Sequence, residues 1–208
     1  MIDITRTLYP DHPNWPGDTP YSLAQTSDIS QGSTVNLMKL ETSTHGGTHL
    51  DAPYHYDETG ATLERIPLEL LIGEALIVHT PRQRVLHAEH LPLPENLPKR
   101  ILFFTGQPER WQSFPESITA FAPDLIHSLA DRGVRLIGTD APSVDALDSK
   151  TLPAHKACGT RGITILESLN LQGVAVGRYH LICLPLALVG ADASPARAIL
   201  TSPAEKTP

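Results

Sequence analysis

The chain has 208 residues, of which 40% are hydrophobic and 19% are charged, and these proportions are ordinary for a globular protein. They argue against intrinsic disorder, and the length predicts one domain over residues 1–208, because two halves would each have a marginal core. The formal net charge of -7 disfavours nucleic-acid binding, which needs a concentrated basic surface, and favours a small-molecule substrate.

The N-terminal residues Met1–Thr5 predict a strand and show no secretory signal. No apolar run is long enough to cross a bilayer, so no membrane association is expected. The two cysteines, Cys158 and Cys183, form neither a disulfide framework nor a thiolate metal motif. We therefore expect a protein of the reducing cytoplasm.

Residues 44–55, with the sequence Thr-His-Gly-Gly-Thr-His-Leu-Asp-Ala-Pro-Tyr-His, combine three imidazoles and one carboxylate. Such residues form mixed nitrogen and oxygen metal sites and do not cluster to stabilise a core. The glycines and the proline weaken a helix, and a straight strand would hold the ligands too far apart for one ion. We therefore expect a strand end that curls and lets His45, His49 and Asp51 converge, with His55 facing the site. The alternative is a solvated polar loop.

Apolar runs bounded by glycine or proline predict the strands of the core. They lie at residues 75–79, 100–104, 134–138, 162–166 and 179–184. The clearest helix is Pro123–Arg132, which has proline and aspartate in its first turn and is followed by glycine. We expect residues 81–100 to form a long ordered connection and Ser202–Pro208 to form a loose tail.

A second group of metal-binding residue types lies downstream. Pro153 suits the first turn of a short helix that carries His155, and Gly159 and Gly162 mark its end. The following apolar run predicts a buried strand, and Glu167 lies where it ends. On spacing alone, the histidine is equally explained as a surface or core residue, and the glutamate as one that reaches solvent.

Three other residues allow two interpretations each. Asp140 ends a strand and would either orient a ligand histidine or cap the following turn. Arg197 would either bind a substrate carboxylate or form a structural ion pair. Cys158 lies near His155 and would be either a nucleophile or inert packing. The chain has no Gly-x-Ser-x-Gly elbow, which disfavours a serine hydrolase.

The segment His-Gly-Gly-Thr-His-x-Asp-x-Pro-x-His at residues 45–55 resembles the signature of the cyclase-type metal-dependent hydrolases. Within this family, three other regions are similar to the bacterial kynurenine formamidases, so that the resemblance covers nearly the whole chain. These regions are residues 15–20, residues 149–155, and residues 184–186 with 192–198. The resemblance implies an α/β, single-domain swivelling β/β/α fold with mixed, mainly antiparallel strands.

The resemblance also implies a role for each candidate site residue. It implies two divalent metal ions, for which the ligand set suits Zn²⁺ with Mn²⁺ as the main rival. The metal ligands it implies are His45, His49, Asp51, His155 and Glu167, with the two carboxylates bridging the ions. His55 would be the catalytic general acid and base. Trp15 would line the substrate pocket, whereas the sequence alone leaves it equally explained as a packed surface residue. Thr44 departs from the family pattern, because related sequences often have proline there.

The activity implied is that of an arylformamidase, which hydrolyses N-formyl-L-kynurenine to L-kynurenine and formate in tryptophan catabolism. Water activated by the two metal ions would attack the formyl carbon, and His55 would protonate the departing arylamine. One alternative is a related amidohydrolase that opens a cyclic amide such as isatin. Another is a non-catalytic metal-binding module, although a purely structural metal site would not need His55. The resemblance further implies a homodimer.

Overall fold

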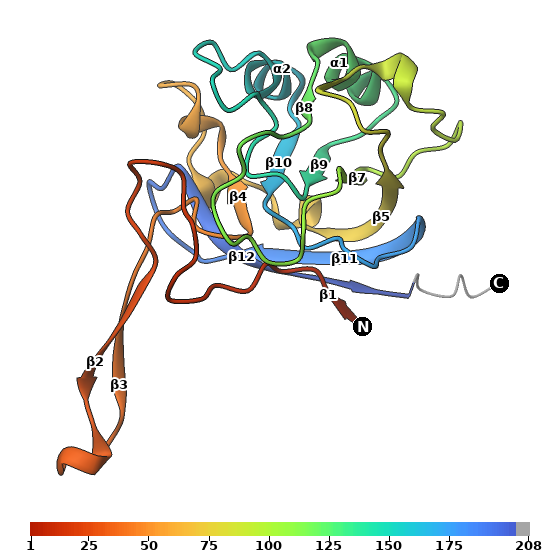
Figure 1. Cartoon of the computed structure of the whole chain (residues 1–208). Helices are drawn as coiled ribbons and strands as arrows, with labels where there is room; N and C mark the ends of the chain where they lie inside the picture. Colours follow the sequence, from red (N-terminus) through yellow and green to blue (C-terminus); the bar gives the residue numbers. More distant parts are fainter. Residues whose placement is uncertain (203–208) are drawn as a thin grey trace.

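A curved sheet organises the chain, and two short helices lie side by side against one of its faces (Figure 1). The structure is a computed structural model, and it describes residues 1–202. The strands of the sheet, in spatial order, are β1 (Ile2–Asp3), β12 (Ala193–Thr201), β11 (Gly177–Pro185), β5 (Ile72–His79), β7 (Arg100–Phe104), β9 (Leu136–Thr139), β10 (Thr164–Glu167) and β4 (His49–Asp51). Because β4 also pairs with β12, every strand of this sheet except β1 belongs to a closed barrel.

Strand direction changes around the barrel. The neighbours β5, β7, β9 and β10 run parallel to one another. The pairings of β1 with β12, β12 with β11, β11 with β5, and β4 with both of its neighbours are antiparallel. The mixed, mainly antiparallel α/β fold implied by the family resemblance is therefore confirmed.

The parallel strands β7, β9 and β10 are buried on both faces, which explains why they are mostly apolar in the sequence. In β7, Ile101 and Phe103 join an apolar cluster under the helices, whereas Leu102 joins a second cluster built from strands around the barrel. The same alternation occurs in β10, where Ile165 faces the helices and Leu166 faces the second cluster. Two apolar cores therefore hold the sheet from its two sides.

The helices are α1 (Pro123–Asp131) and α2 (Pro153–Arg161), and both begin with proline as predicted. The predicted end of α1 is correct to within one residue. The end of α2 is set by Gly162, whose φ of 62° is left-handed, and not by Gly159, which lies inside the helix. A Cβ atom at Gly159 would lie 2.8 Å from the ring of Tyr56, so this glycine permits close packing.

Each predicted core strand is present within a few residues of its expected ends, but several other strands were not predicted. They are β12, the parallel pair β6 (Val85–Leu86) and β8 (Ala120–Phe121), and the hairpin β2 (Ser22–Ser27) and β3 (Leu37–Glu41). In β12, Pro195 and a series of small residues weaken the strand pattern in the sequence. The hairpin projects from the body as an arm (Figure 1), and its strands lack the alternation of a half-buried strand because they are almost entirely exposed.

Residues 81–100 form the long connection that the sequence predicts, and this connection contains β6. The predicted loose tail lies outside the described residues except for Ser202. Across residues 1–202, no helix has both the length and the apolar character needed to span a membrane.

A buried arginine ties the N-terminal segment to the barrel. Arg6 is only 2% exposed, and its guanidinium lies over the ring of Trp111 at 3.9 Å from the ring centre. Its nitrogens donate to the carbonyl oxygens of Pro108, Glu109, Asp140 and Leu169. Burial lowers the pKa of Arg6 to about 10, which still leaves the side chain charged at neutral pH.

Replacing this side chain tests its contribution to stability. We expect Arg6→Met to lower the free energy of unfolding by at least about 2 kcal/mol, because each buried acceptor that is left unpaired costs about 1–3 kcal/mol. The control is Arg197→Met, which removes an exposed ion pair with Asp3 and should cost less than about 1 kcal/mol. Urea denaturation followed by circular dichroism measures both, and equal losses would contradict this role for Arg6.

Candidate metal centre

The predicted ligand segment enters the barrel at β4, which pairs with strands on both sides. Within β4, His49 lies opposite Glu167 of β10, and strand alternation places His49 and Asp51 on the same face. Just before β4, Gly47 has a φ of 67°, a left-handed conformation that glycine adopts without strain. This bend turns His45 back, so that its Nδ1 lies 3.2 Å from Oδ1 of Asp51. The curled strand end predicted from the sequence is confirmed.

The carboxylate of Asp51 lies between imidazoles from different parts of the chain. Its Oδ1 is 3.3 Å from Nε2 of His49, and its Oδ2 is 3.5 Å from Nε2 of His155. Glu167 faces the same two rings, with Oε2 3.3 Å from Nε2 of His49 and Oε1 3.6 Å from Nε2 of His155. All four side chains are buried. The structure therefore brings together the five residues that the sequence analysis named as ligands, since His45 approaches the same carboxylate.

The donor atoms at this point fit divalent metal ions. Among the described residues, Nε2 of His49 and both carboxylate oxygens of Asp51 are buried and receive no hydrogen bond. One potential ligand atom from each of His49, Asp51 and Glu167 lies within 4.8 Å of the others, and the same holds for His45, Asp51 and His55. Imidazole nitrogens and carboxylate oxygens at this spacing are the ligands of zinc and similar cations. Asp51 is shared by the two groups.

The pKa values of the histidines show how negative this site is. Burial lowers the pKa of His49, but the carboxylates of Asp51 and Glu167 more than offset it and raise the pKa to about 10. The same opposition holds for the two other ligand histidines. Burial lowers their pKa values, but nearby carboxylates more than offset it and raise the pKa of His155 to about 10 and that of His45 to about 9. A divalent cation would relieve this negative potential and displace the protons.

A carboxylate that the sequence analysis did not identify fixes His155 at the start of α2. Asp145 accepts hydrogen bonds from the backbone N–H groups of Ala154 (2.9 Å) and His155 (3.0 Å), and its Oδ2 lies 2.7 Å from Nδ1 of the His155 ring. It therefore both caps the helix and leaves Nε2 of His155 facing Asp51. Its position, well before the helix, gives no capping signal in the sequence.

Asp140, which the sequence suggested for such an orienting role, does not perform it. Its carboxylate accepts hydrogen bonds from Thr105, Gly106 and Gln107, which form the loop after β7. The expectation that it caps the turn after its own strand is also wrong, because β9 ends beside β7 and the carboxylate points to the neighbouring loop. Asp140 stabilises that loop.

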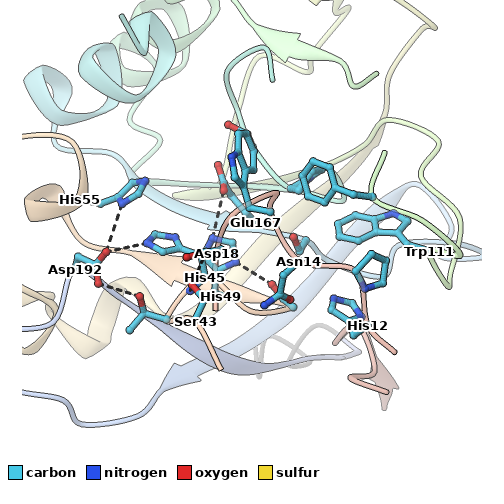
Figure 2. Close-up of a pocket in the computed structure, with 18 of the residues that line it drawn as sticks. His12, Asn14, Asp18, Ser43, His45, His49, His55, Trp111, Glu167 and Asp192 are labelled. Atoms are coloured by element: carbon cyan, nitrogen blue, oxygen red, sulfur yellow. Dashed lines mark hydrogen bonds and ion pairs between the residues drawn. The ribbon is translucent and has the colours of Figure 1, made fainter. Parts of the chain in front are cut away.

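His55 lies on a 3₁₀ turn, Pro53–His55, directly after β4. Its ring centre is 4.1 Å from that of His45 and 5.7 Å from that of His155, so it faces the candidate metal site as expected. Its Nδ1 lies 3.5 Å from Oδ2 of Asp192, a second carboxylate that the sequence analysis did not identify. Figure 2 shows Asp192 directed toward both His45 and His55. The signal for Asp192 was its place in a segment similar to the family.

A cavity of about 460 Å³ opens over these residues. Trp15 lies in its lining and packs edge-on against Phe114 with 5.3 Å between ring centres. Trp111 (Figure 2) also lines the cavity, with its ring centre 6.3 Å from that of Phe114, and its ring nitrogen donates to Gln107. The cavity thus combines an aromatic wall with a floor of imidazoles and carboxylates, which suits a small aromatic substrate.

The structure favours the structural interpretation of two other residues. Arg197 forms an ion pair with Asp3 at the surface and does not line the cavity. Cys158 is fully buried in the apolar cluster under the helices. Burial and nearby carboxylates raise the pKa of its thiol well above the ordinary value, so that it is an inert packing residue.

Several known proteins are similar to this chain over most of its length. The family model described as "Putative cyclase" matches residues 2–146. A kynurenine formamidase from Paracidovorax citrulli is 41% identical over 98% of this chain and 97% of its own length. A kynurenine formamidase from Salinibacter ruber is 43% identical over 96% of each chain.

Solved structures have the same architecture. A "predicted metal-dependent hydrolase" from Bacillus stearothermophilus has a TM-score of 0.76 and 30% identity, over 95% of this chain and 96% of that one. Isatin hydrolase A from Labrenzia aggregata has a TM-score of 0.80 over 97% of this chain and 93% of that one, but its identity of 24% shows the fold alone. The similarity to the metal-dependent hydrolase and the donor atoms around Asp51 support the use of divalent metal ions by this protein.

Metal binding at this site should stabilise the protein. We expect Zn²⁺ or Mn²⁺, added to metal-free protein at about 100 times its dissociation constant, to contribute about 2.7 kcal/mol and to raise the melting temperature by about 5–10 °C. Asp51→Asn should abolish most of this rise because it removes the shared carboxylate, whereas Asp148→Asn, a change outside the site, should preserve it. Thermal melts with and without metal measure the effect, and an unchanged rise in Asp51→Asn would refute the site.

Proposed function

The chain belongs to the cyclase family, and on this basis we propose that it is an arylformamidase that converts N-formyl-L-kynurenine and water into L-kynurenine and formate. This reaction is an amide hydrolysis in tryptophan catabolism. The observation that carries the proposal is the convergence of imidazoles and carboxylates around Asp51 at the floor of an aromatic cavity. The full-length similarity to kynurenine formamidases supports this choice of substrate.

We propose that two divalent ions, most favourably Zn²⁺ with Mn²⁺ as the rival, bind at this floor. The residues that would hold them are His45, His49, Asp51, His155 and Glu167. When bound, such ions act as Lewis acids and lower the pKa of water. The buried carboxylates of Asp51 and Glu167 supply the negative charge, and the imidazoles supply nitrogen ligands with fixed orientations.

We propose His55 as the general base and acid. Burial lowers its pKa, which keeps the imidazole neutral near pH 7 and able to accept a proton from the attacking water. The protonated ring can then donate that proton to the arylamine nitrogen, which would be a poor leaving group as an anion. The side chain is 32% exposed and lines the cavity, so a substrate can reach it.

Trp15 and Phe114 would form the wall against which the aryl ring of the substrate packs. Their edge-on contact holds both rings at the cavity lining. A formyl group is small enough to lie beyond this wall, next to His55 and Glu167, which also line the cavity. The cavity therefore has room for an aromatic amide with a small acyl group.

Opening of a cyclic amide such as isatin is the second candidate function. The similarity of fold to isatin hydrolase A favours it, and the same imidazoles and carboxylates would serve that reaction. It fits less well, because the relatives named kynurenine formamidase are far more similar in sequence. A non-catalytic metal-binding module is disfavoured by His55, which lines the cavity and is not needed to hold a structural ion.

We also propose that the protein is a cytoplasmic homodimer. The arm formed by β2 and β3 supports a dimer, because an isolated two-stranded hairpin is only marginally stable and this one exposes apolar side chains. These exposed side chains include Leu23, Leu37, Met38 and Leu40. A second copy of the chain would cover them.

A direct assay tests the choice of substrate. We expect the purified, metal-loaded protein to release formate from N-formyl-L-kynurenine with a kcat/KM at least about tenfold higher than that for the opening of isatin. Formate is measured with a coupled dehydrogenase, and isatin opening is followed by absorbance. Activity on isatin without formate release would establish the second candidate function instead.

Two substitutions separate metal binding from proton transfer. We expect His55→Ala to keep nearly normal metal content and to lower kcat by about 10²–10⁴-fold, because proton transfer contributes about that factor. Asp51→Ala should lose metal as well as activity, since its carboxylate faces three histidines. Elemental analysis and the formate assay measure both variants. Equal metal loss in the two would mean that His55 is a ligand.

A further inference from the structure

One carboxylate lies between the candidate general base and a candidate metal ligand. Oδ2 of Asp192 is 2.9 Å from Nε2 of His45 and 3.5 Å from Nδ1 of His55 (Figure 2). Its other oxygen, Oδ1, accepts a hydrogen bond of 3.0 Å from the hydroxyl of Thr44. All three neighbours come from the segment that leads into and out of β4, whereas Asp192 directly precedes β12.

The backbone holds Asp192 firmly in this place. Its carbonyl oxygen accepts a hydrogen bond of 2.8 Å from the N–H of Ala52, and the next residue, Ala193, pairs with Asp51 across β4 and β12. The carboxylate is therefore fixed by contacts that do not involve either histidine ring.

The contacts of His49 and His155 show which ring nitrogen of each faces Asp51. His49 directs Nδ1 to the carbonyl oxygen of Gly47 (2.8 Å), and His155 directs Nδ1 to Asp145 (2.7 Å), so both offer Nε2 to Asp51. His45 is reversed, because its Nε2 faces Asp192 and its Nδ1 faces Asp51. An oxygen of a carboxylate or carbonyl accepts a hydrogen bond from the ring nitrogen that faces it. Where a divalent cation takes the nitrogen that faces Asp51, the proton of the ring lies on the other nitrogen.

We propose that Asp192 is a positioning residue that sets the tautomers of two histidines at once. It holds the proton of His45 on Nε2, which leaves Nδ1 to the metal site, and it holds the proton of His55 on Nδ1, which leaves Nε2 as the base. The contact to His55 is the longer one, and such contacts commonly tighten when substrate binds. Asp192 thereby couples the orientation of the general base, His55, to that of the candidate metal ligand, His45.

This proposal rests on the proposed function of His55, and a double-mutant cycle tests it. At saturating metal, Asp192→Asn should lower kcat by about 10–100-fold with KM nearly unchanged, because the amide has one acceptor oxygen and cannot orient both rings. In the His55→Ala background the same change should lower kcat by less than about twofold. The control Asp57→Asn, an exposed aspartate near His55 in the sequence, should leave kcat unchanged. Losses that multiply in the double variant would overturn the proposal.

Nitrogen-15 NMR of the histidine rings gives a readout that does not depend on turnover. We expect the His55 signals, identified by their loss in His55→Ala, to show the Nδ1–H tautomer in the wild type and a mixture of tautomers in Asp192→Asn. An Nε2–H tautomer of His55 in the wild type, or the same tautomer in both proteins, would overturn the proposal. If the wild type releases no formate but the tautomers change as expected, the proposed function fails and the positioning role of Asp192 stands.

Discussion

The site is organised by one unfavourable charge, the carboxylate of Asp51, which is buried with no hydrogen bond to either oxygen from the described residues. A buried charge without compensation is strongly destabilising, so positive charge must lie beside it. His45, His49 and His155 surround it at distances of 3.2 to 3.5 Å. Protons on these rings or metal ions between them both meet this requirement, which is why the same geometry raises histidine pKa values and suits divalent cations.

Closure of the barrel and assembly of this site are the same structural event. β4 has only three residues, yet it pairs with β10 on one side and with β12 on the other. The pairing with β10 brings Glu167 opposite His49, and the pairing with β12 brings Asp192 next to the turn that carries His55. The carboxylates of the site repel one another, and the backbone hydrogen bonds of the sheet hold them together. The remaining strands of this sheet bury two apolar cores, which stabilise it.

The sequence predicts this site where its chemistry is local and fails where it depends on strand order. His45, His49 and Asp51 could be found because they share one segment and its glycines allow a bend. Nothing in the spacing of residues more than a hundred positions apart brings His155 or Glu167 to them, so the family resemblance was needed. Asp145 and Asp140 show the limit of prediction from the sequence. Both follow strand β9, but the partners of each carboxylate depend on which strands neighbour β9, and the sequence does not show these neighbours. β12 was missed for a related reason, since Pro195 and small residues suffice where neighbouring strands on both sides supply the pairing.

The carboxylates of the centre divide into two kinds by what they face. Asp51 and Glu167 face the point where cations would lie, whereas Asp145 and Asp192 face the outer nitrogens of the imidazoles. Asp145 is 2% exposed and also caps a helix, so it fixes His155 rigidly. The side chain of Asp192 is 36% exposed, and it lies beside His55 at the cavity where substrate and protons must pass. The rigid contact with Asp145 keeps the ligand nitrogen of His155 in place. The more open position of Asp192 leaves His55 able to exchange protons with solvent.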